Sequence, residues 1–149
     1  MATRTLVQMI EDHGEAIAQR VVRKLRQDPQ LRHIARLPES ELSSRALEVV
    51  KNFGRWLAPG GEREAALRFE QLGRRRAEEA IPLCEVVRAL QILKGNILDY
   101  IREQGVGHTY LELYAEEELE HLAGRFFDNA IYHVICGYEG AAQHAAHSA

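Results

Sequence analysis

The nucleophilic side chains of this sequence lack the partners that catalysis requires. Ser43 and Ser44 lie outside any Gly-x-Ser-x-Gly motif, and no order of serine, histidine and acid suggests a triad. Cys84 falls in the first turn of a predicted helix, a position that can activate a thiol, but no histidine or second cysteine lies within a few residues. We therefore predict that the chain is not an enzyme and has no catalytic residues.

The residues that could bind a metal ion do not form a complete ligand set. Glu118 and His121 form a single Glu-x-x-His motif, whereas a di-iron site in a helix bundle needs two such motifs and two further carboxylates. His144 and His147 lie in a small-residue tail that we expect to be weakly structured. The two cysteines are far apart and outside any Cys-x-x-Cys spacing, so we predict reduced thiols and no metal site.

The composition fits one domain of a globular protein. The 149 residues carry a formal net charge of -3, which gives no electrostatic reason to expect nucleic acid or an anionic membrane as the partner. No run approaches the roughly 18 apolar residues of a membrane-spanning helix, and the N-terminus lacks the apolar core of a signal peptide. We predict a cytoplasmic domain that binds neither nucleic acid nor membranes.

The apolar residues recur with a period close to 3.6, and no stretch alternates as a half-buried strand does, so the sequence predicts an all-α fold. Capping boxes at Thr5 with Gln8 and at Thr109 with Glu112 mark two helix starts. The segment "APGG", residues 58–61, is the clearest loop. Five helices are predicted, from Thr5 to Pro29, from Pro38 to residue 57, and over 62–79, 82–104 and 109–138.

Gly54, Gly73, Gly95 and Gly124 each fall inside a predicted helix, where a glycine costs roughly 1 kcal/mol relative to alanine. Such glycines are typical of helices that cross at a close distance. We expect the close contacts at Gly95 and Gly124, because these two lie within apolar helix faces.

Residues 72–98 place three consecutive arginines and a proline between apolar segments. Pro82 fits the first turn of a helix and breaks a helix interior, so it predicts a corner where one helix ends and the next begins. Arg74 and Arg75 lie near the cation-favouring end of the third predicted helix and can each pair with the glutamate four residues later. Because the arginines are partly neutralised, we do not expect them to bind nucleic acid.

The segment "LGRRRAEEAIPLCEVVRALQILKGNILDYI" resembles the signature of the N-terminal domain of the RsbR-type RsbT co-antagonists. These proteins are bacterial stressosome sensors, and the domain also precedes some histidine kinases and transcription regulators. The similarity consists of a leucine, a small residue, arginines, an acidic pair, a hydrophobic-Pro-Leu corner and an apolar helix with Arg88. It covers residues 69–104 well, and "FFDNAIYHVICGYEG", residues 126–140, is similar to the terminal helix of the family.

The resemblance implies a globin-like helical bundle without haem, which dimerises and serves as an input module coupled to an output domain. On this basis residues 1–149 form a single RsbR N-terminal-like sensor domain. Its implied function is non-catalytic signalling in a bacterial stress-response or two-component regulator. The implied partners are a second copy of the chain, a downstream output domain or stress-signalling proteins.

A globin-like fold also raises the alternative of a haem- or small-ligand-binding sensor, in which haem needs an axial ligand such as a histidine. The predicted helix over 82–104 contains no histidine or methionine, which leaves His108, His121 and His133. His121 and His133 are about 120° apart around a helix and do not face one pocket together. His133 lies beside apolar residues, which favours a hydrogen-bonded core or interface histidine. We therefore predict no cofactor.

Six of the ten aromatic residues lie on the last predicted helix. Phe126 and Phe127 project about 100° apart, so one core stripe cannot hold all of these aromatics. We expect a second buried face, covered by a second copy of the chain. The predicted dimer and signal interface includes Phe127, Tyr132 and Tyr138. Tyr138 is favoured as its centre, because it lies near the point where family members pass into the output domain.

Overall fold

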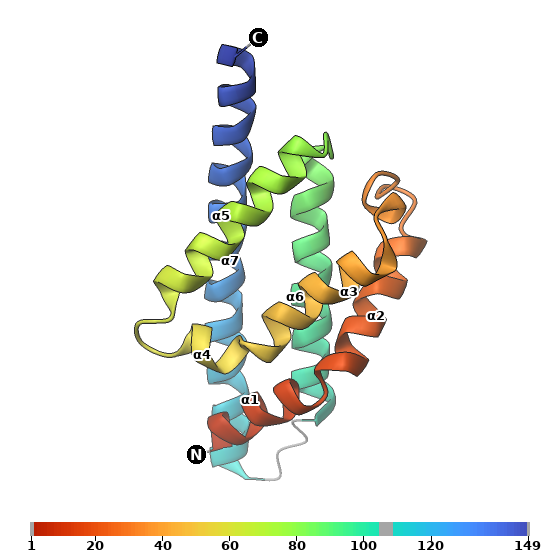
Figure 1. The fold of residues 1–149 in the computed structure, drawn as a ribbon. Coiled ribbons are helices and arrows are strands. Elements are labelled where there is room, and N and C mark those ends of the chain that lie inside the picture. Colours follow the sequence, from red (N-terminus) through yellow and green to blue (C-terminus); the bar gives the residue numbers. More distant parts are fainter. Residues whose placement is uncertain (1, 105–108, 149) are drawn as a thin grey trace.

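The computed structural model describes residues 2–104 and 109–148, and these residues form a single all-α domain without strands (Figure 1). The all-α fold predicted from the apolar period is confirmed, and the arrangement is consistent with a globin-like helical bundle. The elements are α1 (Ala2–Asp12), α2 (Gly14–Gln27), the 3-10 helix η1 (Ile34–Arg36), α3 (Glu39–Lys51), α4 (Phe53–Leu57), α5 (Glu62–Glu78), α6 (Leu83–Gln104) and α7 (Tyr110–Ser148).

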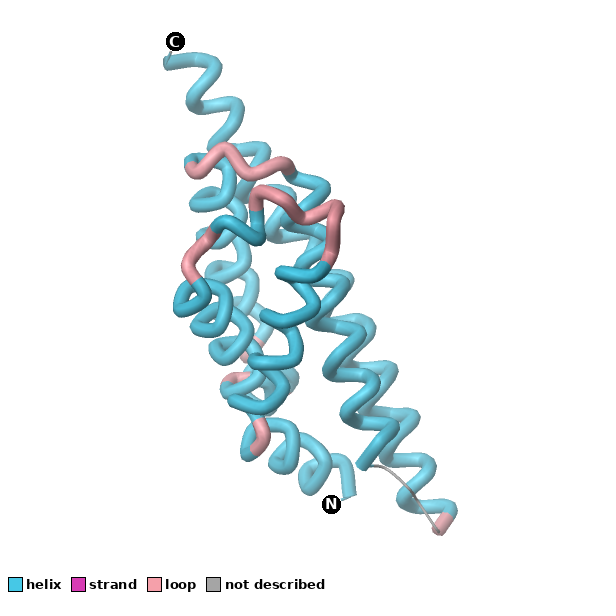
Figure 2. The backbone as a smooth tube through the Cα atoms, turned by 90° about the vertical axis from the view of Figure 1, so that its right-hand side faces the viewer, coloured by secondary structure: helices cyan, strands magenta, loops and turns pink. Residues whose placement is uncertain are grey.

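The two longest helices, α6 and α7, run antiparallel, and α5 crosses α7 obliquely (Figure 1). Helices α2 and α3 pack against each other, and α2 also lies against α6, while α1 reaches α7 at the other end of the bundle. The last turns of α7 extend beyond the other helices, which is clearest from the side (Figure 2). Helix α7 therefore runs along the whole bundle and projects from it.

The core lies where these helices meet, and one broad face of α7 contributes to it. Phe127 is fully buried and Phe126 is 9% exposed, with their ring centroids 5.1 Å apart in an edge-to-face arrangement. The rings of Phe53 and Phe69 contact Phe126 from α4 and α5 at centroid distances of 5.7 and 5.8 Å. Phe126 and Phe127 therefore both lie in the core of their own chain, on one broad face of α7, and they do not mark the second buried face that we expected.

The predicted first and second helices are wrong in detail. Helix α1 already begins at Ala2, so Thr5 lies inside it and is not its N-cap. The chain then breaks at His13, where φ is -103° and ψ is 21°, although the apolar period continues across the break. The second predicted helix breaks at Asn52, whose Nδ2 donates a hydrogen bond of 2.7 Å to the Glu48 carbonyl and competes with the helical pattern.

The start of α7 is confirmed and its end is corrected. The Glu112 amide donates a hydrogen bond of 3.2 Å to Thr109 Oγ1, as the capping box predicts. The helix does not end near Tyr138 but continues through Ser148. The segment predicted to be a weakly structured tail is rich in alanine, the strongest helix former, and so it extends the helix.

The closest approach between helices is at the crossing of α5 and α7. A Cβ atom added to Gly73 would fall against the Val134 carbonyl oxygen of α7, and one added to Gly137 would fall against the Glu70 carbonyl oxygen of α5. Both contacts are with backbone atoms, which cannot rotate away as a side chain can. The crossing therefore requires glycine on both helices.

Our expectation for the other helical glycines is wrong. Nothing lies within 4 Å of a Cβ atom added to Gly95 or Gly124, so these two positions have open space. Apolar neighbours along a helix show which face is buried, but they do not show where another backbone crosses it. A third close approach is at Gly54, where an added Cβ would lie 2.9 Å from the side chain of Val7 in α1.

The corner predicted at Pro82 is confirmed, because α5 ends at Glu78 and α6 begins at Leu83. The Ile81 amide donates to the Arg76 carbonyl and the Ala80 amide to the Ala77 carbonyl, both at 3.0 Å, which is the pairing of a Schellman motif. Ala80 has a φ of 58°, in the left-handed region that favours glycine. The helix end thus stores a small amount of backbone strain.

Candidate functional site

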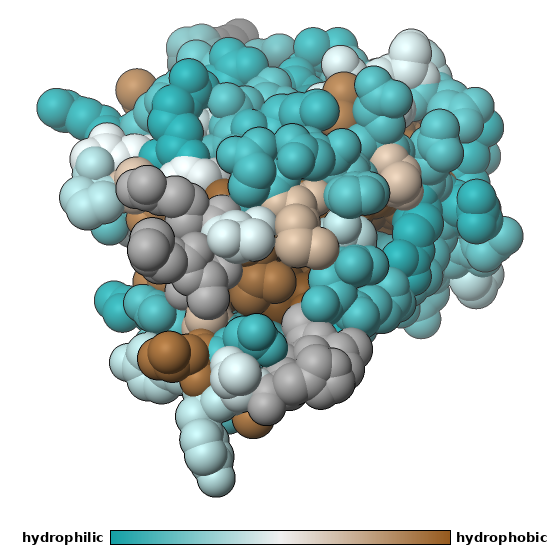
Figure 3. All heavy atoms as spheres, turned by 90° about the horizontal axis from the view of Figure 1, so that it is seen from below, coloured by the Kyte–Doolittle hydropathy of each residue, from teal (hydrophilic) through white to brown (hydrophobic). Residues whose placement is uncertain are grey.

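Helix α7 carries most of the exposed large apolar side chains. In the part of the chain that the structure describes, six large apolar side chains are exposed, and five of them lie on this helix: Tyr110, Leu111, Leu113, Tyr114 and Tyr132. Tyr114 and Tyr132 are separated by about five helical turns and so share one face. We call the face marked by Tyr110, Tyr114 and Tyr132 the outer stripe of α7. Figure 3 shows hydrophobic side chains on the end of the molecule where α7 begins.

The three residues predicted for the interface have different surroundings. Phe127 is 0% exposed and faces the core of its own chain. Tyr138 is half-buried, and its hydroxyl donates a hydrogen bond of 2.6 Å to the Ile81 carbonyl, which ties α7 to the corner. Tyr132 is 62% exposed on the outer stripe, where a hydrogen bond with Cys136 raises the pKa of its hydroxyl. Of the three, Tyr132 is the one that can meet another molecule directly.

The three consecutive arginines differ in burial and pairing. Arg76 is only 4% exposed and pairs with Glu79 at 2.7 Å and Glu41 at 3.4 Å. Arg75 pairs with Glu41 at 3.5 Å and, as predicted, with Glu79 at 3.9 Å. Arg74 is exposed, and no carboxylate among the described residues lies within ion-pair distance of it, so its predicted pair is not formed. This cluster fixes the end of α5 to α3.

Glu41 is the shared carboxylate of this cluster. Burial raises its pKa, but the hydrogen bond from Arg45 and the positive charges of Arg45, Arg75 and Arg76 lower it further, so the pKa lies below the ordinary value. The charged form of Glu41 is therefore favoured by the folded state.

A buried carboxylate fixes the start of α6 to η1. Glu85 is 5% exposed, and it accepts hydrogen bonds from the backbone amides of His33 at 2.9 Å and Ile34 at 3.1 Å. His33 Nδ1 lies 2.6 Å from the other oxygen of Glu85. One turn later, Arg88 pairs with Asp28 at 2.7 Å. The segment that carries the family resemblance therefore holds the corner against α2, η1 and α3.

A cavity of about 370 Å³ opens between α4, α5 and α7. The two crossing helices touch at Gly73 and Gly137, and the first turns of α5 lie away from α7 (Figure 1). We call this space the wedge cavity. Its aromatic side chains are Trp56, Phe69 and Phe126, and its polar ones are Glu62, Arg125, Asn129 and His133.

The histidines proposed as axial ligands are dispersed. His133 lines the wedge cavity, and its Nδ1 lies 3.2 Å from Glu70 Oε1, which confirms the expected hydrogen-bonded histidine. His121 is exposed, and His108 lies outside the described residues. Over residues 2–104 and 109–148, no three histidine, cysteine or acidic side chains gather closely enough to hold a metal ion.

Sequence reasoning missed two residues of this region, Trp56 and Gly137. Trp56 is the only tryptophan of the chain and lies just before the loop over 58–61, which is a signal that could have drawn attention to it. Gly137 lies within the segment similar to the family's terminal helix, but its partner is a backbone atom of α5, far away in the sequence. Contacts of this kind become visible only when the helices are placed.

Comparison with known protein families supports the resemblance. A family model described as the RsbT co-antagonist protein rsbRD N-terminal domain matches residues 15–149. The matched range includes the corner, the crossing of α5 and α7, the wedge cavity and the outer stripe. Neither a search of curated proteins nor a search of solved structures found a match. None of the described helices has the length and apolar character needed to cross a membrane.

Proposed function

Because the chain belongs to the family of RsbT co-antagonist protein rsbRD N-terminal domains, we propose that it is a dimerising, non-catalytic input module of a bacterial stress-response or two-component regulator. The family places the chain among the N-terminal domains of stress-signalling co-antagonists. The finer parts of the proposal are the homodimer, the cytoplasmic location and the transfer of a signal to an output domain or a stress-signalling partner protein.

The observation that supports dimerisation is the outer stripe of α7. A cluster of exposed large apolar side chains, such as the one at the start of α7, is typical of surfaces that a partner covers. A two-fold contact uses the same surface on both copies, so one such helix face is sufficient for both. Tyr132 lies in the middle of α7 and is the centre of the proposed interface, in place of the favoured Tyr138, which is engaged with the corner.

The course of α7 supports a parallel arrangement of the two copies. Its last turns extend beyond the rest of the bundle (Figures 1 and 2). A two-fold axis along α7 would place both projecting ends on the same side, where they can meet an output domain together. The glycine crossing with α5 and the bond from Tyr138 to Ile81 connect these ends to the corner. A change in the packing of α5 would then alter the position of α7.

Light scattering tests the proposed dimer. At micromolar concentration we expect about twice the chain mass of 16.9 kDa. The variant Tyr132→Asp should be a folded monomer, because it places a charge at the centre of the interface. The matched control is Leu67→Asp on α5, where the replaced leucine is 54% exposed but lies away from the outer stripe, and it should stay dimeric. A strictly monomeric parent chain would contradict the proposal.

A further inference from the structure

We propose that the wedge cavity binds a small aromatic carboxylate, whose ring packs against Trp56, Phe69 and Phe126 and whose carboxylate is held by Arg125. This site goes beyond the proposed function, because it lies within one chain and does not depend on dimerisation. The argument rests on the aromatic side chains that line the cavity and on an unpaired cation beside them.

Three aromatic side chains that are almost fully buried line the inner side of the wedge cavity. Trp56 is 2% exposed, Phe69 3% and Phe126 9%. The Trp56 and Phe126 rings are stacked at a centroid distance of 6.3 Å, and Phe69 meets Trp56 edge to face at 5.9 Å. The volume of about 370 Å³ lies within the range of small-molecule sites. Such a wall favours a flat apolar body, because aromatic rings pack in offset or edge-to-face arrangements.

The polar side chains of the cavity are mainly donors. Arg125 lines it from α7, and no carboxylate of the described chain lies within ion-pair distance of its guanidinium. Asn129 follows one turn later and offers a second donor. His133 is engaged with Glu70, and among the described residues that line the space Glu62 is the only carboxylate. An unpaired guanidinium beside an aromatic wall favours a monoanion, which it can bind with two parallel hydrogen bonds.

Trp56 makes the site directly measurable, because the fluorescence of the chain's only tryptophan reports on it. The full chain is titrated into the millimolar range with phenylacetate, with its neutral analogue phenylacetamide and with acetate, which lacks the ring. We expect a saturable change in Trp56 fluorescence with phenylacetate. Phenylacetamide and acetate should bind about ten-fold more weakly or not at all, because the first lacks the carboxylate and the second lacks the ring.

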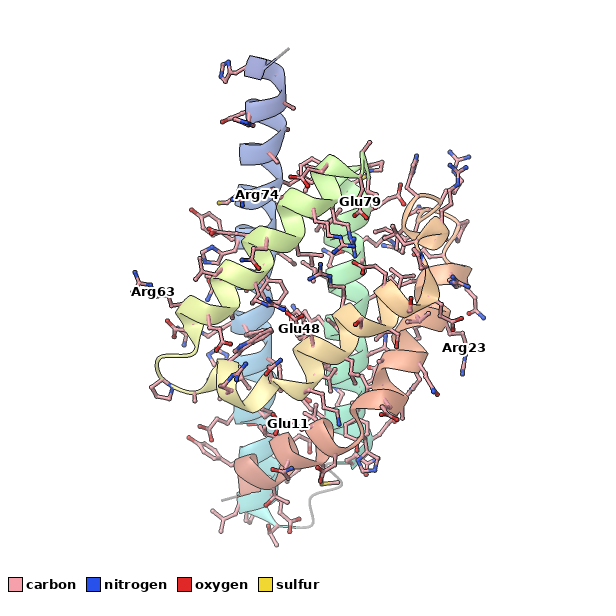
Figure 4. All side chains as sticks on the ribbon, in the orientation of Figure 1. Glu11, Arg23, Glu48, Arg63, Arg74 and Glu79 are labelled. Atoms are coloured by element: carbon pink, nitrogen blue, oxygen red, sulfur yellow. The ribbon has the colours of Figure 1, made fainter. Side chains whose placement is uncertain are left out.

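Two arginine variants separate recognition from general charge. Arg125→Gln should weaken phenylacetate binding about ten-fold and leave phenylacetamide unchanged. The control Arg63→Gln removes an exposed arginine of α5 that points away from the bundle and does not line the cavity, and it should bind phenylacetate normally (Figure 4). Trp56→Phe keeps an aromatic ring but removes part of the aromatic wall, and calorimetry should show weaker binding of phenylacetate.

The outcomes also distinguish this site from the proposed dimer. The variant Tyr132→Asp should still bind phenylacetate, since the cavity is complete in one chain. The proposal is overturned if phenylacetate produces no saturable change, or if it binds no better than phenylacetamide and Arg125→Gln has no effect. A Trp56 signal that changes with protein concentration in the absence of any carboxylate would show that a second copy fills the cavity, and this too would overturn the proposal.

Discussion

Replacing Gly73 with alanine should destabilise the domain, although alanine is the better helix former. The added Cβ would fall against the Val134 carbonyl oxygen and within 2.9 Å of the Tyr138 amide nitrogen. These are backbone atoms of α7, so the contact can be relieved only if α5 and α7 move apart. That movement would disturb the packing of Phe69 and the hydrogen bond from Tyr138 to Ile81.

The expected magnitude follows from two opposing contributions to the free energy of unfolding. Overpacking costs about 1–3 kcal/mol, and we take the upper value because the atoms that the added Cβ would meet belong to the backbone of α7. Alanine recovers about 1 kcal/mol through its helix propensity. The net loss is therefore about 2 kcal/mol, which corresponds to a fall in Tm of roughly 4–8 °C for a domain of this length.

Urea and thermal unfolding, followed by circular dichroism, measure this loss. The matched controls are Gly95→Ala and Gly124→Ala, where an added Cβ meets nothing within 4 Å. Each control should raise the free energy of unfolding by about 0.5–1 kcal/mol, through helix propensity and the lower freedom of the unfolded chain. If Gly73→Ala were as stable as these controls, α5 and α7 would not approach as described, and the reasoning would be refuted.

Two further changes test the corner and the arginine cluster. Ala80→Gly should raise the free energy of unfolding by about 0.5–1 kcal/mol. Glycine removes the backbone strain at a φ of 58°, and the greater conformational freedom of glycine in the unfolded chain cancels part of that gain. Urea unfolding measures the change, and a loss of stability would contradict the Schellman geometry. Glu41→Gln should cost about 1–2 kcal/mol at neutral pH, because it leaves the buried Arg76 with one carboxylate partner. The pKa of Glu41 is lowered by folding, so its contribution is complete above the pKa of the unfolded chain and is lost as the pH falls through the folded value. Unfolding measured over a pH series should therefore show the two proteins converging in acid, and a difference independent of pH would contradict this account.

The sequence was sufficient to predict the elements and most of their inward faces. A period of 3.6 needs only local spacing, and Pro82 and the "APGG" loop mark boundaries through the restrictions of their own backbones. The breaks at His13 and Asn52 were missed, because the apolar pattern runs through them without interruption. The length of α7 was underestimated, because a tail of small residues was taken for weak structure although alanine favours helix.

The arrangement of the site depends on contacts between distant segments, which local spacing does not contain. Gly73 is needed because the backbone of α7 lies against it, and Gly137 is needed because the backbone of α5 lies against it. The residues that flank each glycine in the sequence do not show this contact. Phe127 was assigned to a partner because a narrow core stripe cannot hold all of the aromatics, but the buried face of α7 is broad enough to hold Phe126 and Phe127 together. The exposure of Tyr132 and the cavity beside Trp56 follow from the same placement of α4 and α5.

Cross-linking at Cys136 tests the proposed parallel dimer most directly. Cys136 is exposed and lies one turn after Tyr132 on α7, so a two-fold axis along the outer stripe brings it close to its counterpart in the second copy. In the variant Cys84→Ser, a short thiol-specific cross-linker should convert most of the protein to a product of twice 16.9 kDa. The same product should be absent from Cys136→Ser, which keeps the exposed Cys84, and from the double variant Cys84→Ser, Tyr132→Asp. Equal cross-linking through Cys84, or none through a Cys136 that remains reactive toward a monofunctional reagent, would contradict dimerisation through α7.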